Sequence, residues 1–169
     1  MRKAIIVGCN GQDGRIAFDL LSAKQYAVAG IDMGVVKGSL QVRPIDICVF
    51  DDVADLLKAF QPDEIYYFAA FHHSSQDTTG ENNIALFNNS YRINVQALLH
   101  FLEGMRLFSS ATRLFYAGSS LLFADTDDEM QSESTPFKPD TVYGITKLDG
   151  LFSCRYYRKN YGIFASVGI

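Results

Sequence analysis

The sequence is short of cysteine, of basic charge and of long apolar runs, and each shortage excludes a class of protein. Its three cysteines, Cys9, Cys48 and Cys154, stand far apart. Their odd number and wide spacing fit neither a disulfide framework nor a set of metal ligands, and favour a reducing compartment, the cytoplasm. No apolar run approaches the roughly 20 residues of a membrane span. The formal net charge of −4 gives no broad basic surface for nucleic acid or anionic lipid.

The residues that are abundant describe an ordinary folded domain. Hydrophobic residues make up 48% of the sequence and charged residues 20%, a balance that excludes intrinsic disorder. A chain of 169 residues has the length of one domain, and it can bury roughly two-thirds of the surface that its unfolded form exposes. We therefore expect a single domain over residues 1–169.

Short apolar runs alternate along the chain with longer amphipathic stretches. We expect strands at residues 4–7, 26–31, 41–45, 64–70, 113–118 and 164–169. We expect helices at 14–24, 53–60, 90–108 and 143–161, and loops at 71–89 and 124–141. This alternation predicts an α/β fold, a doubly wound parallel sheet of about six strands with helices on both faces.

A glycine-rich stretch follows the first expected strand and precedes the first expected helix. Gly8, Gly11 and Gly14 stand at Gly–x–x–Gly–x–x–Gly spacing, which allows a tight turn and a close approach of the backbone to a pyrophosphate. The helix N-terminus then offers free N–H groups and a partial positive charge to that anion. The stretch indicates a dinucleotide site; a glycine-rich turn without a ligand is the alternative.

Asp32 closes the second expected strand, where an acidic residue can accept hydrogen bonds from the hydroxyls of an adenosine ribose. Its charge would repel a 2′-phosphate, and in the segment that follows only Lys37 offsets this repulsion. The sequence therefore favours NAD, with NADP as the alternative. The alternative interpretation of Asp32 is a solvated carboxylate at a strand end.

A tyrosine and a lysine share one face of the last expected helix. Tyr143 and Lys147 are four residues apart, so the phenol and the ammonium project to the same side. A nearby cation favours phenolate and lowers the tyrosine pKa from about 10, which suits a general acid/base. Ser119, at the end of the fifth expected strand, would face the same crevice. A pair on the helix surface is the alternative.

Together these motifs resemble the extended short-chain dehydrogenase/reductase superfamily. Within its NAD-dependent epimerase/dehydratase family, the chain is most similar to the GDP-mannose 4,6-dehydratase branch. The resemblance rests on Gly11-Gln12-Asp13-Gly14, residues 63–70, Asn94-Val95, residues 133–139, Tyr143-Gly144 and Lys147-Leu148. It implies a Rossmann fold that binds NAD or NADP and acts on a nucleotide sugar.

The resemblance also implies roles for single residues. Ser119 would polarise the sugar hydroxyl or carbonyl, Tyr143 would move the proton, and Lys147 would bind the nicotinamide ribose and tune Tyr143. Ser120 is an alternative to Ser119, although the spacing to the tyrosine favours Ser119. The cofactor would contact Gly8, Gly11, Gln12, Asp13, Gly14, Asp32, Asp46, Ile47, Ala69, Ala70, Tyr143 and Lys147.

One position departs from the pattern of the family. Its dehydratases carry a glutamate two positions after the catalytic Ser or Thr, and this chain has Leu121 there, which cannot do acid/base work. We therefore expect a nucleotide-sugar-modifying enzyme of the epimerase/dehydratase type that transfers a hydride and a proton at the sugar C4. The alternatives are a GDP-mannose 4,6-dehydratase proper and a non-catalytic NAD(P)-binding fragment or regulator.

Length and assembly follow from the same resemblance. Because the family runs to roughly twice this length, we expect the C-terminal substrate domain to be absent from the chain. Family dimers pair the helices that correspond to residues 90–108 and 143–161, so a homodimer is expected. The adjacent His72 and His73 are interpreted as polar loop residues near a pocket, because no cluster with metal-ligand spacing accompanies them.

Overall fold

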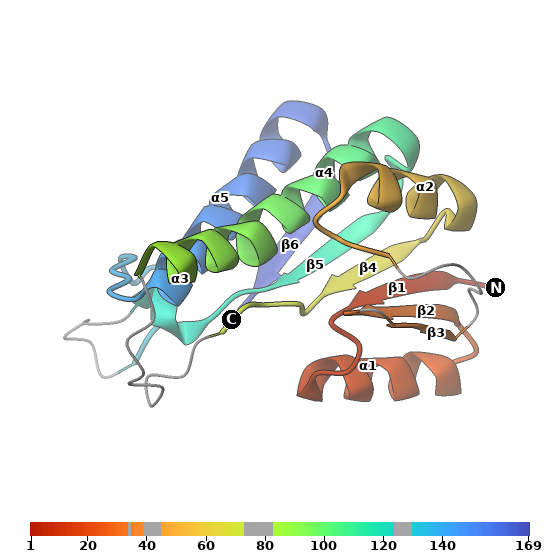
Figure 1. Ribbon diagram of the computed structural model, residues 1–169, viewed down its shortest axis with the longest axis horizontal. Helices are drawn as coiled ribbons and strands as arrows, with labels where there is room; N and C mark the ends of the chain where they lie inside the picture. Colours follow the sequence, from red (N-terminus) through yellow and green to blue (C-terminus); the bar gives the residue numbers. More distant parts are fainter. Residues whose placement is uncertain (34, 39–44, 73–82, 124–129) are drawn as a thin grey trace.

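The computed structural model in Figure 1 describes residues 1–33, 35–38, 45–72, 83–123 and 130–169. Its centre is a six-stranded sheet in the order β3-β2-β1-β4-β5-β6. The strands are β1 (Lys3–Val7), β2 (Ala27–Asp32), β3 (Val35–Gly38), β4 (Glu64–Tyr67), β5 (Arg113–Ala117) and β6 (Phe164–Gly168). The chain proceeds outward from β1 in both directions, so the doubly wound α/β fold is confirmed.

Helices cover both faces of the sheet, as predicted. The α-helices are α1 (Gln12–Ala23), α2 (Phe50–Phe60), α3 (Asn83–Ser90), α4 (Ala97–Phe108) and α5 (Val142–Tyr161). In Figure 1, α1 lies on one face, and α2, α4 and α5 lie on the other. Among the described residues, no helix is long and apolar enough to cross a membrane.

The central strand shows why both faces are covered. Ala4 and Ile6 pack into one hydrophobic cluster with residues of α1, whereas Ile5 and Val7 pack into the larger cluster with residues of α2 and α4. Because successive side chains of a strand point to opposite faces, an unbroken apolar run must be buried on both. The apolar run of β1 therefore requires the three-layer arrangement.

The third strand departs from the parallel arrangement of the other strands. β3 pairs antiparallel with β2, Asp32 opposite Val35, whereas every other described pairing is parallel. Only Met33 and Gly34 separate the two strands, and so short a connection can join only antiparallel neighbours. The strand expected at 41–45 falls almost wholly outside the described residues.

The predicted loop at 71–89 is also partly wrong, because its last residues form α3. This helix continues without a break into η1, a π-helical turn (Tyr91–Gln96), and then into α4. The asparagines and serine of this stretch favour caps and turns, which is why the sequence suggested a loop. The later helix, α5, begins one residue before the predicted start and ends at the predicted residue.

Candidate functional site

The glycine-rich turn joins β1 to α1 and packs against the segment after β4. Gly8 has φ +86°, and a Cβ at this position would lie 2.7 Å from the backbone nitrogen of Ala69. A side chain would therefore both strain the turn and fill the space between the two strand ends. No side chain caps the first turn of α1, which begins at Gln12 after Gly11. Its N–H groups and the small residues beside them fit a bound diphosphate.

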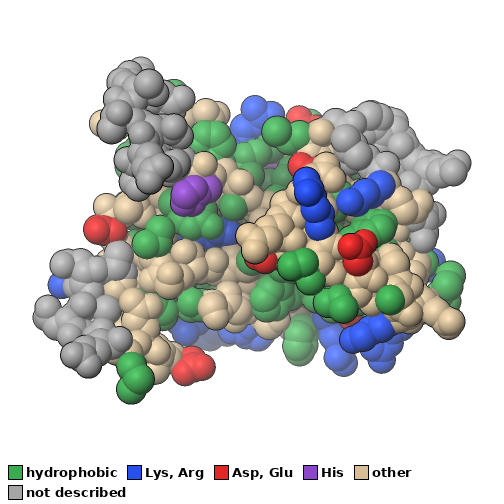
Figure 2. Space-filling model, turned by 90° about the horizontal axis from the view of Figure 1, so that it is seen from below, with side chains coloured by type: hydrophobic (Ala, Val, Ile, Leu, Met, Phe, Trp, Pro, Cys, Tyr) green, Lys and Arg blue, Asp and Glu red, His purple; other side chains and the backbone are tan. Residues whose placement is uncertain are grey.

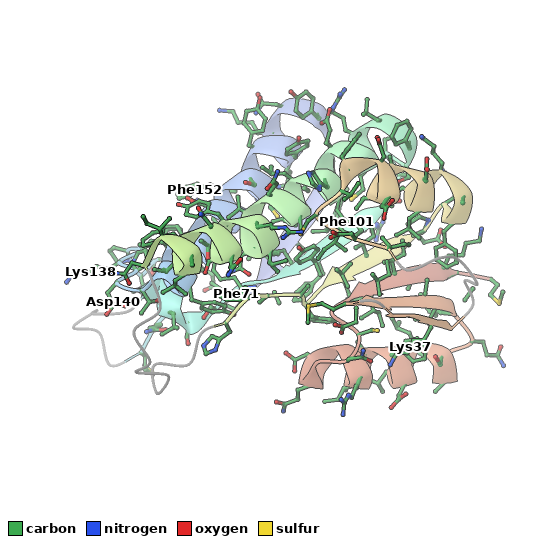
Figure 3. The ribbon with its side chains drawn as sticks, in the orientation of Figure 1. Lys37, Phe71, Phe101, Lys138, Asp140 and Phe152 are labelled. Carbon is green, nitrogen blue, oxygen red and sulfur yellow. The ribbon has the colours of Figure 1, made fainter. Side chains whose placement is uncertain are left out.

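Asp32 reaches across the same turn from the end of β2. Its carboxylate accepts hydrogen bonds from the backbone N–H of Asn10, at 2.7 Å, and of Met33, at 2.9 Å. Lys37 points from β3 towards α1 (Figure 3), with its ammonium 3.4 Å from the carbonyl oxygen of Cys9 and 4.7 Å from the ring centroid of Phe18. The fold thus holds a carboxylate and a cation against neighbouring residues of the turn, Asn10 and Cys9.

The other expected cofactor contacts are more scattered. Gln12 and Asp13 are exposed in the first turn of α1, and Ala70 is exposed after β4. Asp46 accepts a hydrogen bond from the backbone N–H of Cys48 and forms an ion pair with Arg92 at 3.5 Å. Ile47 packs against the larger core cluster. These contacts fix the position of the Asp46–Ile47 pair, and its role towards adenine stays a prediction.

Ser119 follows β5 and precedes η2, a single 3-10 turn (Ser120–Phe123). Its hydroxyl oxygen accepts a hydrogen bond from the backbone N–H of Leu121 at 3.1 Å, and the residue is half-buried, whereas Ser120 is exposed. Leu121 is half-buried, and its carbonyl oxygen lies where a Cβ on Gly144 would come within 2.7 Å. The turn after β5 is therefore packed directly against the start of α5.

Tyr143 and Lys147 lie one turn apart on α5, as the sequence predicts. Lys147 is 1% exposed, and its ammonium donates a hydrogen bond to the carbonyl oxygen of Ala117 at the end of β5, at 2.8 Å. The same nitrogen lies 5.5 Å from the ring centroid of Tyr143. The pair is thus joined to the strand that carries Ser119, although its catalytic role stays a prediction.

The pKa of Tyr143 differs in direction from the expectation. Burial raises the pKa of the phenol, and burial lowers the pKa of Lys147 to about 8. Each shift has the same cause, because a low-dielectric surrounding disfavours whichever form is charged. The expected lowering by the neighbouring cation is therefore wrong for the chain without ligands.

Sequence reasoning set aside or missed three residues at this site. The imidazole of His72 stands edge-on to the phenol of Tyr143, with ring centroids 4.8 Å apart and planes at 81°. Asn94 and Tyr116, both buried, lie behind the pair. His72 could have been found from its place just beyond β4, at the same edge of the sheet as Ser119; its neighbour His73 lies outside the described residues.

The described residues also bear on metal binding and on the distribution of charge over one face of the molecule. Within the described ranges, no group of three or more His, Cys, Asp or Glu side chains could hold a metal ion. On the face seen in Figure 2, basic and acidic side chains are interspersed with apolar ones rather than gathered in one basic patch.

A mostly parallel sheet with this turn after β1 and with a tyrosine–lysine pair on the helix after β5 is the architecture of the extended short-chain dehydrogenases/reductases. The chain lies in their NAD-dependent epimerase/dehydratase branch. The sequence profile of the GDP-mannose 4,6 dehydratase family matches residues 5–169, and the chain belongs to that family.

Individual relatives agree with this assignment. The chain is 30% identical to the GDP-mannose 4,6-dehydratase of Yersinia enterocolitica over its whole length, and 28% identical to one from Vibrio cholerae over 99% of its length. It spans 49% of each of these relatives, about half their length. A structure of UDP-glucose 4-epimerase from Brucella ovis in complex with NAD superposes with a TM-score of 0.85 at 20% sequence identity. The match covers 99% of this chain and 51% of the epimerase chain.

Proposed function

We propose that the chain binds NAD and provides the redox half of a nucleotide-sugar-modifying enzyme. The observation that carries this proposal is the junction of the Tyr143–Lys147 pair with the end of β5, beside Ser119 and on the same edge of the sheet as the glycine-rich turn. Family membership supports it, and so do similar structures of epimerases in complex with NAD. Asp32 supports NAD over NADP, because its charge opposes a 2′-phosphate.

In the proposed reaction, the phenolate of Tyr143 takes the proton of the sugar C4 hydroxyl. The glycine-rich turn and Asp32 would hold NAD, which would supply the acceptor for the hydride of C4, so that loss of the proton and the hydride would leave a 4-keto sugar. The hydroxyl of Ser119 donates a hydrogen bond to the C4 oxygen, and the ammonium of Lys147 stabilises the phenolate. Because the pKa of Lys147 is about 8, the side chain is mainly charged at pH 7 and can do so.

The fate of the 4-keto sugar depends on Leu121. Elimination of water needs a group that takes the C5 proton and another that protonates the leaving hydroxyl, and leucine provides neither. We therefore propose epimerase or oxidoreductase chemistry. The family match favours the second candidate, dehydration of GDP-mannose, which would require its acid/base group from elsewhere.

The test separates cofactor binding from turnover. NAD and NADP are titrated calorimetrically into the chain, and NAD should bind more tightly. The chain with NAD is then incubated with GDP-mannose and with UDP-glucose, and the products are followed by NMR beside Tyr143→Phe. A product that the variant does not form supports the proposal. NAD binding without any product favours the non-catalytic alternative, and no NAD binding contradicts both.

We also propose that two copies pair through α5 and the helix that includes η1 and α4. A groove of about 480 Å³ between them is lined by Val95, Leu99, Asp149, Phe152, Ser153, Tyr156 and Tyr157. Phe152 and Tyr156 are 48% and 54% exposed there, and Phe152 projects outward from α5 (Figure 3). Light scattering should show a dimer that Phe152→Glu abolishes and that Phe164→Glu, at an equally exposed position on β6, leaves intact; a monomeric parent chain contradicts this.

The remaining proposals concern organisation and place. Residues 1–169 would form one NAD(P)-binding domain. The three cysteines are free thiols, two of them buried, which supports a cytoplasmic location.

A further inference from the structure

Lys147 is a buried cation whose surroundings are short of polar partners. Among the described residues, its ammonium has one hydrogen bond, to the carbonyl oxygen of Ala117, and it is paired with no carboxylate. An ammonium without a counter-ion in a buried site is costly, and it tends to lose its proton. A group other than a carboxylate is therefore needed to stabilise the ammonium of Lys147 beside Tyr143.

Tyr116 occupies the position behind the ammonium. It lies on β5, is fully buried, and presents its ring at 4.6 Å from the Lys147 nitrogen. The face of an aromatic ring attracts a cation, and the attraction is largest where water is excluded. With Tyr143, whose ring lies 5.5 Å from the same nitrogen, it gives Lys147 two ring faces.

The fold accommodates the ring of Tyr116 because a glycine, and not a residue with a side chain, lies beside it on α5. Gly150, one turn after Lys147 on α5, lies directly against it, and a Cβ on that glycine would come 2.5 Å from the phenol oxygen of Tyr116 and 2.6 Å from Cζ. The phenol hydroxyl donates a hydrogen bond to the backbone carbonyl of Asn94, at 3.3 Å. That carbonyl belongs to η1, and π-helical turns free backbone groups from the regular ladder.

We propose that Tyr116 is a positioning residue for the Lys147–Tyr143 pair: its ring holds the ammonium in its charged form beside Tyr143, and its hydroxyl ties the ring to η1. Only the role of the charged lysine in catalysis rests on the proposed function; the effect of Tyr116 on the charge of Lys147 does not.

The neighbouring strand supplies a matched control. Tyr67 pairs with Tyr116 in register between β4 and β5, is equally buried, and donates its hydroxyl to the carbonyl of Ile93, also in η1. The cation–ring contacts of Lys147 are with Tyr116 and Tyr143. A change at Tyr67 therefore tests burial and tethering without the cation.

The experiment compares rings of nearly equal shape and different electron density. Tyr116→Phe is prepared, and then a ring-fluorinated phenylalanine is placed at the same position, which weakens the attraction of the ring face for a cation. The same two changes are made at Tyr67. The pKa of Lys147 is read from the pH dependence of its 13Cε NMR signal, assigned by its absence in Lys147→Met.

Tyr116→Phe should leave the pKa of Lys147 close to that of the parent chain, and fluorination at 116 should lower it by about one pH unit. Neither change at 67 should move it. Equal pKa values for the two rings at 116, or equal shifts at 116 and 67, would overturn the proposal. Because these readouts need neither NAD nor substrate, they stand apart from the proposed function, which fails separately if the chain does not bind NAD.

Discussion

Asn94 is the polar side chain on which the geometry of the site depends most. It is fully buried in η1, and its amide oxygen accepts a hydrogen bond from the backbone N–H of Phe71 at 2.7 Å. Its amide nitrogen donates to the carbonyl of Phe71, at 3.2 Å, and to the hydroxyl of Thr146, at 2.9 Å. Phe71, which follows β4, and Thr146, which lies between Tyr143 and Lys147 on α5, are thereby joined through one residue.

Asn94→Ala removes these three hydrogen bonds, and we expect it to lower the free energy of unfolding by about 3–4 kcal/mol. Roughly 1 kcal/mol comes from each bond, and the remainder from the unsatisfied groups and the small cavity that are left. Urea unfolding of the variant beside the parent chain measures the difference. Asn89→Ala, at an exposed position of α3, is the control and should change stability by less than about 0.5 kcal/mol. A loss below about 1 kcal/mol for Asn94→Ala would refute this account of the site.

Three further predictions concern Lys147, Gly8 and Asp32. The unfolded chain holds the proton of Lys147 up to its ordinary pKa of 10.5 and the folded chain only to about 8, so between these values the unfolded chain binds more protons and this residue adds stability as pH rises. The free energy of unfolding of the parent chain minus that of Lys147→Met should thus rise by about 2 kcal/mol from pH 8 to pH 10. Burial raises the pKa of the thiols, which lowers stability as pH rises, but this effect is present in both chains and cancels in the comparison. A difference that stays constant with pH contradicts the burial of the charge. Gly8→Ala should cost about 1–3 kcal/mol in thermal unfolding and abolish NAD binding, whereas Gly162→Ala, with φ +69° but open space around it, should cost about 1 kcal/mol. Asp32→Ala should weaken NAD binding about 10- to 100-fold in calorimetry and reduce the preference of the chain for NAD over NADP. An unchanged affinity for NAD would contradict a contact between Asp32 and the cofactor.

The sequence was a good guide wherever a local pattern decides the structure. The apolar run of β1, the glycine spacing after it and the four-residue spacing of Tyr143 and Lys147 each depend on neighbours within one or two turns. The apolar pattern did not reveal β3, because this strand is short and its pairing with β2 is set by the two-residue connection between them. It also failed at α3, where tertiary context overrides the turn preference of asparagine.

The polar connections behind the site could not be predicted for a different reason. The hydrogen bonds of Asn94 join residues that are far apart in the chain, and no spacing rule relates them. The same holds for Tyr116, whose ring is accommodated only because Gly150 passes over it without a side chain. The spacing of Tyr143 and Lys147 placed the two residues on one face of α5, but it gave the wrong direction for the tyrosine pKa, because burial cannot be read from spacing on a helix.

Burial acts on this pair in a way that defines its resting state. The raised pKa of Tyr143 keeps the phenol protonated at neutral pH, while Lys147, with a pKa of about 8, remains mainly charged. A protonated phenol beside an ammonium is ready to donate a proton to a developing alkoxide, which is the step that accompanies return of a hydride to a ketone. The opposite step requires the phenol to lose its proton first, and each contact that holds the ammonium in its charged form makes that loss easier. The ring of Tyr116 and the carbonyl of Ala117 are such contacts, and in the proposed reaction they would influence the balance between the two directions together with the groups that would meet the sugar.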